Sequence, residues 1–301
     1  HCTLGGRIKS DFVVLEVGIG GKLDATNCIP APAAALIAQL GFDHTETLGS
    51  TIEEIAAQKG GIAKSGSQLV MAEQEPAALR VVEQLCREQG CGFTVADPER
   101  LQVLSTSPEG QQLRDRTYGE LLLPLAGSHQ VKNAANVLTV VEVLKGEGFA
   151  IPDRAVRQGI ERTVWPARFE RLSRSPDFIL DGGHNPQCVQ AAVQALQDYY
   201  PGKKVVFLTG MMKDKDSAAM LAKMAEVAKA FVCLHAASER AFGAQELARE
   251  IENTLSLAAY PAASAQEGCA LAQRLAGEQG VVCALGSLYL AGEIRAVFHR
   301  E

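Results

Sequence analysis

The strongest constraint on the fold is an alternation of apolar runs and amphipathic stretches through the second half of the chain. Runs that are apolar throughout are typical of parallel strands covered on both faces, and their alternation with helices predicts a doubly wound sheet. Ligand groups of such sheets lie at the carboxyl ends of strands, where this chain has Asp181, Gly210 and Gly286. Strands are predicted at FILD (178–181), KVVFLTGMM (204–212), AFVCLHAA (230–237) and VVCALG (281–286), and helices at 187–200, 217–228, 244–255, 267–280 and 287–298.

The first half of the chain carries strand and helix signals of the same kind. Thr51 and Glu54 have the spacing of a capping box, which predicts a helix that ends at about Lys59, before two glycines. The polar stretch 43–48 has the composition of a loop. Strands are predicted at 12–17, 34–42, 67–73 and 92–96, and an amphipathic helix at 76–90.

A different pattern separates the two halves. Residues 98–123 alternate polar and apolar residues in short runs, which predicts a hairpin-like excursion. Apolar residues then recur at helical spacing after Asn133, so His129 and Asn133 stand at a helix N-terminus, a position that suits phosphate and polar ligands. A small helix and a linker follow in 146–166. The predicted domains are therefore 1–163 and 164–301.

Composition disfavours several classes of protein. The formal net charge is -6 with no basic block, so a nucleic-acid partner is not expected. The eight cysteines lie mostly in apolar surroundings without C-x-x-C pairs, which favours reduced packing residues. No apolar run reaches the roughly 18–20 residues of a spanning helix, and the first residues lack the basic and apolar regions of a signal peptide. We expect a monomeric, cytoplasmic protein with no membrane partner and, because the chain opens at His1, a piece of a longer chain.

Two nucleotide-binding motifs are approached but not satisfied. EVGIGG (16–21) resembles the start of G-x-G-x-x-G, but Leu23 stands where the third glycine belongs. The phosphate-binding loop G-x-x-x-x-G-K-[ST] has its nearest approach at Gly21 and Lys22, which Glu16 precedes and Leu23 follows. These glycines more simply let the backbone turn closely after the predicted strand, with Glu16 near the strand's end.

Glu16 and His44 lie at the ends of two successive predicted strands, so both side chains can meet above one sheet edge. A carboxylate oxygen and an imidazole can ligate Mg²⁺ beside substrate phosphates, because magnesium commonly keeps only one or two protein ligands. The alternative is a buried acid paired with another group. Lys59, at a helix end, is by itself either a partner of the helix dipole or a desolvated lysine used chemically.

Seven ordered blocks together resemble one family of enzymes. The chain is similar over nearly its whole length to folylpolyglutamate synthase/dihydrofolate synthase, within the Mur ligase superfamily. The resemblance implies an α/β fold: a truncated Mur-ligase-type ATPase domain followed by a Rossmann-like C-terminal domain with a mostly parallel sheet. The blocks are LEVGIGGKLDATN (15–27), DHTETLGSTIEEIAAQKGGIAK (43–64), GSHQVKNAANVL (127–138), WPARFE (165–170), DGGHNP (181–186), GMMKDKD (210–216) and GSLYLAGE (286–293).

The resemblance implies an ATP-dependent amide ligase. A folate carboxylate attacks the γ-phosphate, and the amine of glutamate captures the acyl phosphate. Lys59 would be carbamylated, which converts a cation into an anionic metal ligand, and Arg168 would offset phosphoryl charge. The implied residues are Glu16, His44 and Lys59 for Mg²⁺; Asn133, Arg168 and Asp181 for ATP; His184 and Ser287 for glutamate; Gly21, Lys22 and Leu23 for folate; and Lys59, Arg168 and His184 in catalysis.

Three positions depart from the family pattern. Lys22 replaces an arginine and loses bidentate recognition, Ala167 replaces the glycine before Arg168, and Gln58 replaces the Glu before the modified lysine. The family's phosphate-binding loop lies upstream of the EVG block and is not among these 301 residues. We therefore expect the fragment to ligate poorly or not at all, because phosphoryl transfer depends on the groups around the phosphates.

Two other functions stay open. One is a non-catalytic remnant that binds folate or glutamate, or serves as an interaction module. The other is a cell-wall Mur ligase, which joins amino acids to UDP-muramyl substrates by the same ATP chemistry. The GGKLDATN and GSLYLAGE blocks favour folate over the muramyl substrates.

Overall fold

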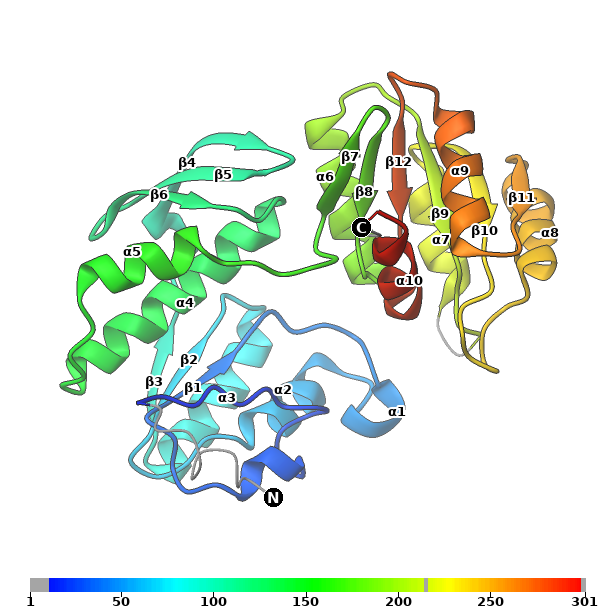
Figure 1. Ribbon diagram of the computed structural model, residues 1–301. Coiled ribbons are helices and arrows are strands. Elements are labelled where there is room, and N and C mark those ends of the chain that lie inside the picture. Colours follow the sequence, from blue (N-terminus) through cyan, green and yellow to red (C-terminus); the bar gives the residue numbers. More distant parts are fainter. Residues whose placement is uncertain (1–10, 214–215, 299–301) are drawn as a thin grey trace. The chain divides into compact units, whose positions relative to one another are not determined.

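The structure, a computed structural model, describes residues 11–213 and 216–298. It divides into two compact units, and Figure 1 shows the elements of each. The domain boundary predicted at 163/164 remains a prediction. The first unit comprises His1–Pro98 and Ala135–Ile151, and the second comprises Glu99–Ala134 and Pro152–Glu301.

The first unit is built on a parallel sheet of three strands in the order β1-β2-β3. Leu69 and Met71 of the central strand are fully buried and belong to one apolar cluster with Ile55 of α2 and Val82 of α3. This layer of helices therefore protects the sheet from water. The elements are β1 (Ala34–Ile37), α1 (Thr45–Leu48), α2 (Ile52–Gly60), β2 (Gln68–Met71), α3 (Pro76–Gln89) and β3 (Gly92–Val95).

In the first unit, the predicted helix at α2 is confirmed, but the strand predicted near the start of the chain is not. The capping box is present, since the Thr51 hydroxyl accepts the Glu54 N–H at 3.2 Å and the Glu54 carboxylate accepts the Thr51 N–H at 3.1 Å. The strand predicted at 12–17 is wrong, because that segment lies outside the sheet and Val14 is 94% exposed. An apolar run becomes a buried strand only beside a partner strand, and this run pairs with none that the structure describes. The predicted loop 43–48 contains the one-turn helix α1.

The predicted excursion is an antiparallel sheet, β4-β5-β6. Its buried side chains include Leu113 of β5 and Leu121 of β6, which lie opposite each other in the ladder. Helix α4 begins in the second unit and continues into the first, with His129 in its first turn and Asn133 in its second. The elements are β4 (Leu101–Ser107), β5 (Gly110–Asp115), β6 (Gly119–Leu123), α4 (Ser128–Gly146) and α5 (Asp153–Glu161).

A six-stranded sheet dominates the second unit, in the order β11-β10-β9-β12-β8-β7. It confirms the mostly parallel sheet, because only β7 pairs antiparallel. The predictions missed β7, which is polar, and β11, which has three residues. The strands are β7 (Glu170–Arg174), β8 (Asp177–Leu180), β9 (Val205–Thr209), β10 (Ala228–Cys233), β11 (Ala259–Pro261) and β12 (Val281–Ala284).

Helices cover both faces of this sheet (Figure 1). One apolar cluster contains Leu196 of α6, Met220 of α7 and Ile251 of α8, and a separate one contains Ala272 of α9 and Ile294 of α10. The helices that follow β8 and β9 therefore pack on one face of the sheet, and the helix that follows β12 packs on the other. Because β12 lies between β8 and β9, the direction of the connections changes on both sides of β12, and such switch points are where open α/β sheets bind ligands. The helices are α6 (Pro186–Tyr199), α7 (Ser217–Ala225), α8 (Ala244–Leu255), α9 (Ala265–Ala276) and α10 (Leu288–Phe298).

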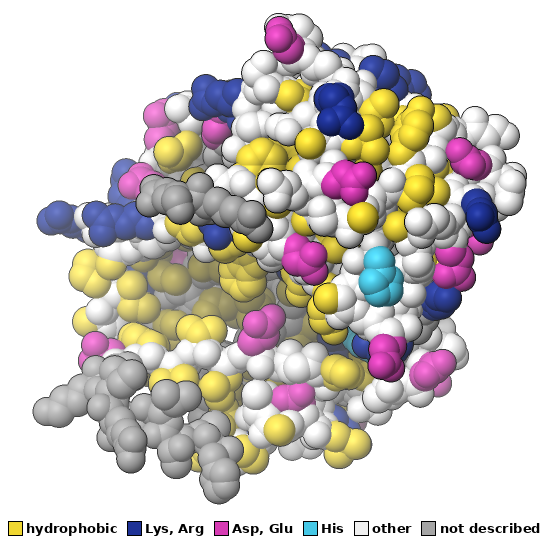
Figure 2. All heavy atoms as spheres, turned by 45° about the vertical axis from the view of Figure 1, so that its right-hand side comes forward, with side chains coloured by type: hydrophobic (Ala, Val, Ile, Leu, Met, Phe, Trp, Pro, Cys, Tyr) yellow, Lys and Arg dark blue, Asp and Glu magenta, His cyan; other side chains and the backbone are white. Residues whose placement is uncertain are grey.

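Surface and thiol properties agree with an ordinary α/β protein. On the face drawn in Figure 2, acidic and basic side chains are interspersed. Within the described ranges, no helix has both the length and the apolarity to cross a membrane. The described cysteines are free thiols and most are buried, as their apolar surroundings predict; Cys2 lies outside the described residues. The buried thiols are Cys86, Cys91, Cys233, Cys269 and Cys283.

Candidate functional site

The glycine turn predicted to contact folate is fastened to the end of α2. The Lys22 N–H donates to the Gln58 carbonyl at 2.9 Å. A Cβ on Gly21 would lie 2.9 Å from the carbonyl oxygen of Lys59, so glycine permits this close approach of two backbones. Leu23 is 89% exposed at the tip of the turn. The structure thus brings Gly21 and Lys22 beside the residue predicted to be modified, Lys59.

The acid and imidazole at 43–44 form a fixed local arrangement. Asp43 Oδ1 accepts the His44 N–H at 2.9 Å. His44 has left-handed dihedral angles, φ 51° and ψ 38°, immediately before α1, and its side chain is half exposed. A non-glycine residue in this conformation costs about 1–3 kcal/mol, and such residues cluster at functional sites. The local strain and the exposed ring are consistent with a ligand-binding role for His44.

The three predicted Mg²⁺ ligands lie on separate elements of the first unit. Glu16 is exposed in the segment outside the sheet, so its predicted place at a strand end is wrong. His44 precedes α1, and Lys59 is in the last turn of α2. A carboxylate and an imidazole suit a cation, whereas Lys59 becomes a ligand only as a carbamate, because an ammonium group repels a metal ion. No cluster of three His, Cys, Asp or Glu able to hold a metal occurs in the described part of the chain, and the shared cation stays a prediction.

In the second unit, the segment that carries Arg168 is tied to the carboxyl end of β8. The Phe169 N–H donates to Asp181 Oδ2 at 2.9 Å, and the Gly182 N–H donates to the Ala167 carbonyl at 2.8 Å. Ala167 and Phe169 both have left-handed backbones, with φ of 55° and 49°. Two such residues flanking Arg168 store strain of about 1–3 kcal/mol each, which the surrounding hydrogen bonds maintain.

Asp181 is a nearly buried carboxyl group close to opposite charge. Burial raises its pKa above the ordinary value, although two backbone N–H groups and the charges of Arg168 and His184 act in the opposite direction. Burial also lowers the pKa of His129, and Arg168 adds to that effect. Because charge coupling weakens with distance, Arg168 lies within electrostatic reach of both Asp181 and His129. The structure therefore gathers the start of α4, the linker arginine and the end of β8.

The N-terminus of α4 is held by close contacts. Gly127 has a φ of 100°, and a Cβ there would lie 2.6 Å from Cε1 of His129. The Gly127 N–H donates to the Tyr199 hydroxyl at 2.8 Å, which anchors the turn to α6. Asn133 is exposed, and its amide donates to Gln130 Oε1 at 3.1 Å. His129 thus lies at the helix N-terminus as predicted, whereas Asn133 lies one turn further along, because α4 begins at Ser128.

The residues predicted to contact glutamate lie at neighbouring strand ends. His184 follows β8, and its Nδ1 lies 3.0 Å from the Gly182 carbonyl oxygen. Ser287 follows β12 and is 5% exposed. Its hydroxyl has no hydrogen-bond partner among the described residues, and the same holds for the fully buried Thr209 at the end of β9. Sequence reasoning missed Thr209; the available signal was a polar residue closing an otherwise apolar strand.

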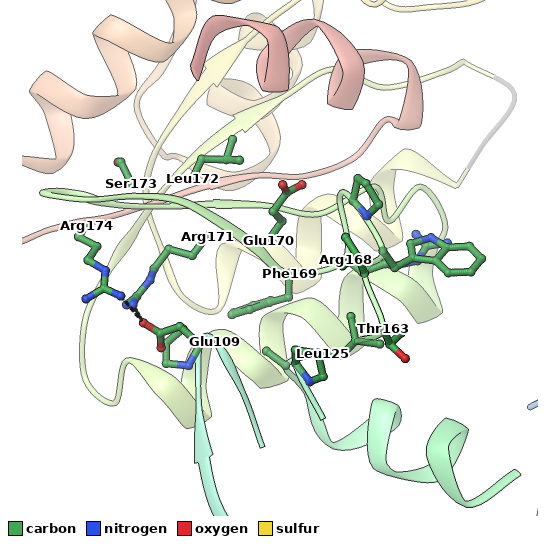
Figure 3. Close-up of a pocket in the computed structure, with 16 residues that line it drawn as sticks. Glu109, Leu125, Thr163, Arg168, Phe169, Glu170, Arg171, Leu172, Ser173 and Arg174 are labelled. Carbon is green, nitrogen blue, oxygen red and sulfur yellow. Dashed lines mark hydrogen bonds and ion pairs between the residues drawn. The ribbon is translucent and has the colours of Figure 1, made fainter. Parts of the chain in front are cut away.

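A cavity of about 380 Å³ adjoins Arg168 (Figure 3). Its wall includes Trp165, Phe169 and Leu125, so aromatic and apolar surface surrounds a guanidinium group. The volume falls in the range of small-molecule sites, roughly 300–1,000 Å³. The lining thus combines apolar surface with the charged group of Arg168.

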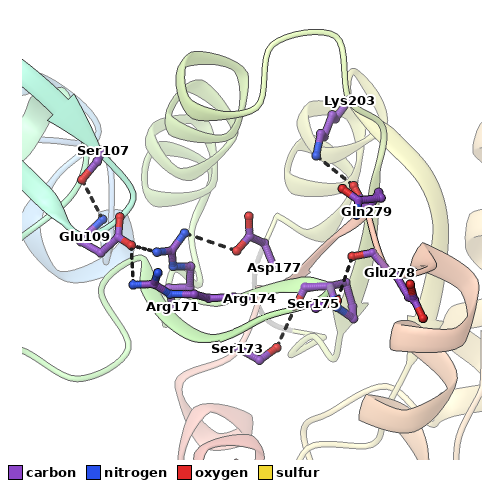
Figure 4. A network of polar contacts seen from close by, with 11 residues as sticks. Ser107, Glu109, Arg171, Ser173, Arg174, Ser175, Asp177, Lys203, Glu278 and Gln279 are labelled. Carbon is purple, nitrogen blue, oxygen red and sulfur yellow. Dashed lines mark hydrogen bonds and ion pairs between the residues drawn. The ribbon is translucent and has the colours of Figure 1, made fainter.

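Several charged residues that line this cavity belong to a network of ion pairs, which Figure 4 shows. Glu109, in the β4–β5 turn, pairs with Arg171 and also with Arg174 at 3.1 Å. Arg171 pairs in addition with Asp177 at 3.3 Å, and its side chain is 15% exposed. These ion pairs attach the hairpin to β7 and define one rim of the cavity.

Comparison with known proteins places this geometry in a family. The Mur ligase middle domain matches residues 6–141, and the Mur ligase glutamate ligase domain matches residues 167–288. A Bacillus subtilis protein named dihydrofolate synthase/folylpolyglutamate synthase is 32% identical over 298 residues, which are 95% of this chain and 67% of that protein. The chain belongs to the folylpolyglutamate synthase/dihydrofolate synthase family of Mur ligases. The family resemblance of the motifs is thereby confirmed.

Solved structures agree with the family assignment. Mycobacterium tuberculosis folylpolyglutamate synthase complexed with ADP matches with a TM-score of 0.82 and 29% identity, over 95% of this chain and 67% of that one. Escherichia coli FolC in complex with DHPP and ADP matches with a TM-score of 0.78 and 26% identity, over 93% and 64%. This member of the family thus spans about two thirds of the length of these relatives.

Membership of this family gives meaning to one departure in the sequence. The resemblance of the WPARFE block implies a glycine before the arginine, and this chain has Ala167 there, with a φ of 55°. Only glycine adopts that backbone without steric cost, so the alanine retains the conformation and adds strain. The roles predicted for Glu16, His44, Lys59, Asn133, Arg168, Asp181, His184, Ser287, Gly21, Lys22 and Leu23 remain predictions.

Proposed function

We propose that the chain provides the metal, ATP, folate and amino-acid contacts of an ATP-dependent ligase that adds L-glutamate to a folate through an acyl phosphate. The observation that carries this proposal is the attachment of the Arg168 segment, which lines the cavity, to the end of β8 through the Phe169 N–H bond to Asp181, in a chain of this family. The relatives' names include dihydrofolate synthase as well as folylpolyglutamate synthase, so dihydropteroate is a second acceptor to test.

Each group has a role in this proposal. Asn133, Arg168 and Asp181 hold ATP, and Arg168 offsets charge on the phosphoryl group. His184 and Ser287 bind glutamate and orient its amine toward the acyl carbon, which raises the effective concentration of the nucleophile. Gly21, Lys22 and Leu23 contact the folate. Mg²⁺, held by Glu16, His44 and carbamylated Lys59, would neutralise phosphate charge when bound.

Ligand binding by the 301-residue chain tests the proposal directly. We expect ATP to bind with Mg²⁺, and Arg168→Ala to weaken binding about tenfold or more, while Arg87→Ala, at an exposed arginine of α3, leaves it within about twofold. Because the phosphate-binding loop is not among these residues, we expect binding without rapid ligation of labelled glutamate to tetrahydrofolate or dihydropteroate. The proposal would be contradicted if the chain bound neither ATP nor glutamate.

Two further properties belong to the same proposal. We infer a monomer, which sedimentation analysis of the purified chain tests, and a cytoplasmic location, which cell fractionation tests. A muramyl ligase would instead bind a UDP-muramyl peptide in preference to a folate. Competition between the two ligand classes for the chain decides between these functions.

A further inference from the structure

Two buried hydroxyl groups without a partner lie at adjacent strand ends of the second unit. Thr209 ends β9 and is fully buried, and Ser287 follows β12, the neighbour of β9 in the sheet. Neither side-chain oxygen has a hydrogen-bond partner among the residues described. Buried polar groups are nearly always hydrogen-bonded, because an unpaired one loses its bonds to water without replacement. These two oxygens therefore mark a place where a partner is missing.

The turn at Gly286 lies directly against Thr209. A Cβ on Gly286 would approach Thr209 Oγ1 to 2.6 Å, and Gly286 has a φ of 114°. Its N–H donates to the Gly183 carbonyl at 2.9 Å, which links the turn to the loop that carries His184. Because Gly286 has no Cβ, its backbone can lie this close to the Thr209 hydroxyl.

A purely structural threonine in this protein has a different arrangement. Thr139, also buried, donates its hydroxyl to the Ala135 carbonyl at 2.8 Å within α4. Thr209 makes no such bond among the described residues, so its hydroxyl contributes a cost rather than stability to the ligand-free protein. A buried hydroxyl without a partner in the protein is accounted for if a bound ligand supplies that partner.

We propose that Thr209 is a third polar group of the amino-acid subsite, where its hydroxyl binds a carboxylate of the incoming glutamate directly or through one water. The inference rests on the proposed function and extends the subsite beyond His184 and Ser287. Hydroxyl donors favour a carboxylate, and the subsite borders the N-terminus of the 14-residue helix α6, which also favours negative charge.

Glutamate-dependent protection against thermal unfolding tests the role of Thr209 in the whole 301-residue chain. Sodium L-glutamate is compared with sodium chloride at equal ionic strength, for the wild type, Thr209→Val, Thr209→Ser and the control Thr139→Val. We expect Thr209→Val to unfold at the same or a higher temperature than the wild type without ligand, because it removes an unpaired hydroxyl. We also expect its affinity for glutamate to fall about tenfold, with recovery in Thr209→Ser.

The Thr139→Val control and the wild type distinguish a failure of the inference on Thr209 from a failure of the proposed function. Thr139→Val loses a satisfied hydrogen bond, so it unfolds at a lower temperature but keeps the glutamate-specific shift. If the wild type shows the shift and Thr209→Val retains it in full, the inference on Thr209 is overturned while the proposed function stands. If the wild type shows no glutamate-specific shift, the proposed glutamate site and this inference both fail.

Discussion

The backbone N–H of Phe169 donates a 2.9 Å hydrogen bond to Oδ2 of Asp181. This bond joins the linker to the end of β8 and holds Arg168 between two residues with left-handed backbones. The other oxygen of the same carboxylate accepts the Gly183 N–H at 2.7 Å. Asp181 therefore has a positioning role for both loops in addition to its proposed contact with ATP.

The strain at Ala167 gives a paired prediction. Ala167→Gly should change the free energy of unfolding by less than about 1 kcal/mol, because relief of the left-handed backbone offsets the extra freedom of the unfolded chain. Ala195→Gly, the same chemical change in the middle of α6, should cost about 1 kcal/mol or more. Urea unfolding of both variants measures the difference. Equal losses would mean that Ala167 is not strained.

The buried pair of Arg100 and Asp115 predicts an acid-sensitive stability. Burial raises the pKa of Asp115, but the Arg100 guanidinium at 2.7 Å and two backbone N–H groups outweigh it, and the net pKa is lowered from 3.8. The pair's contribution is thus fully present above pH 3.8 and is lost as the pH falls through the lower pKa of the folded state. Asp115→Asn should cost about 3 kcal/mol at pH 7 and flatten this acid limb.

Unfolding measured from pH 7 down to pH 2 checks that prediction. Glu83→Gln serves as the control, because Glu83 belongs to an exposed pair with Arg87. Its stability should follow the wild-type pH profile to within about 0.5 kcal/mol. An Asp115→Asn profile parallel to the wild type over the whole range would refute the assignment.

The attachment of the β4–β5 turn to β7 depends on Glu109. Glu109→Gln should lower the free energy of unfolding by about 1 kcal/mol, because it removes one of the two charges that pair with the mostly buried Arg171 and leaves Asp177 as the other. Glu120→Gln, in an exposed pair with Arg114, should cost less than about 0.5 kcal/mol. Urea unfolding at low and high salt distinguishes them. A cost for Glu109→Gln no larger than for Glu120→Gln would show that the attachment is not stabilising.

Gly286 provides a test of local packing. Gly286→Ala should destabilise the protein by about 2 kcal/mol, because the new methyl would meet Thr209 Oγ1 at 2.6 Å and φ is 114°. Gly159→Ala should stabilise it by about 0.5–1 kcal/mol, since Gly159 is inside α5 with open space around its added methyl. Thermal unfolding of the two variants should therefore move in opposite directions.

Part of the candidate site could be predicted from where the apolar runs end along the chain. Asp181, Gly210 and Gly286 were assigned to strand ends because apolar runs stop there, and the structure has these residues just beyond β8, β9 and β12. His184 and Ser287 were singled out by the family resemblance instead. Thr209 was not singled out, because its lack of a partner depends on the neighbouring turn at Gly286 rather than on its own segment. The electrostatic link between Arg168 and His129 also joins segments that no local pattern connects.

Local patterns along the chain were sufficient to predict the alternating α/β architecture of residues 178–298 and the capping box of Thr51 and Glu54. Both follow from periodicity and from bonds between near neighbours, which act whatever the rest of the chain does. The three-dimensional fold was needed to show that the apolar run 12–17 stays outside the sheet and that Ala167 adopts a left-handed backbone. Those outcomes depend on which strands and loops meet across the chain, because pairing partners and tolerated strain are supplied by distant segments.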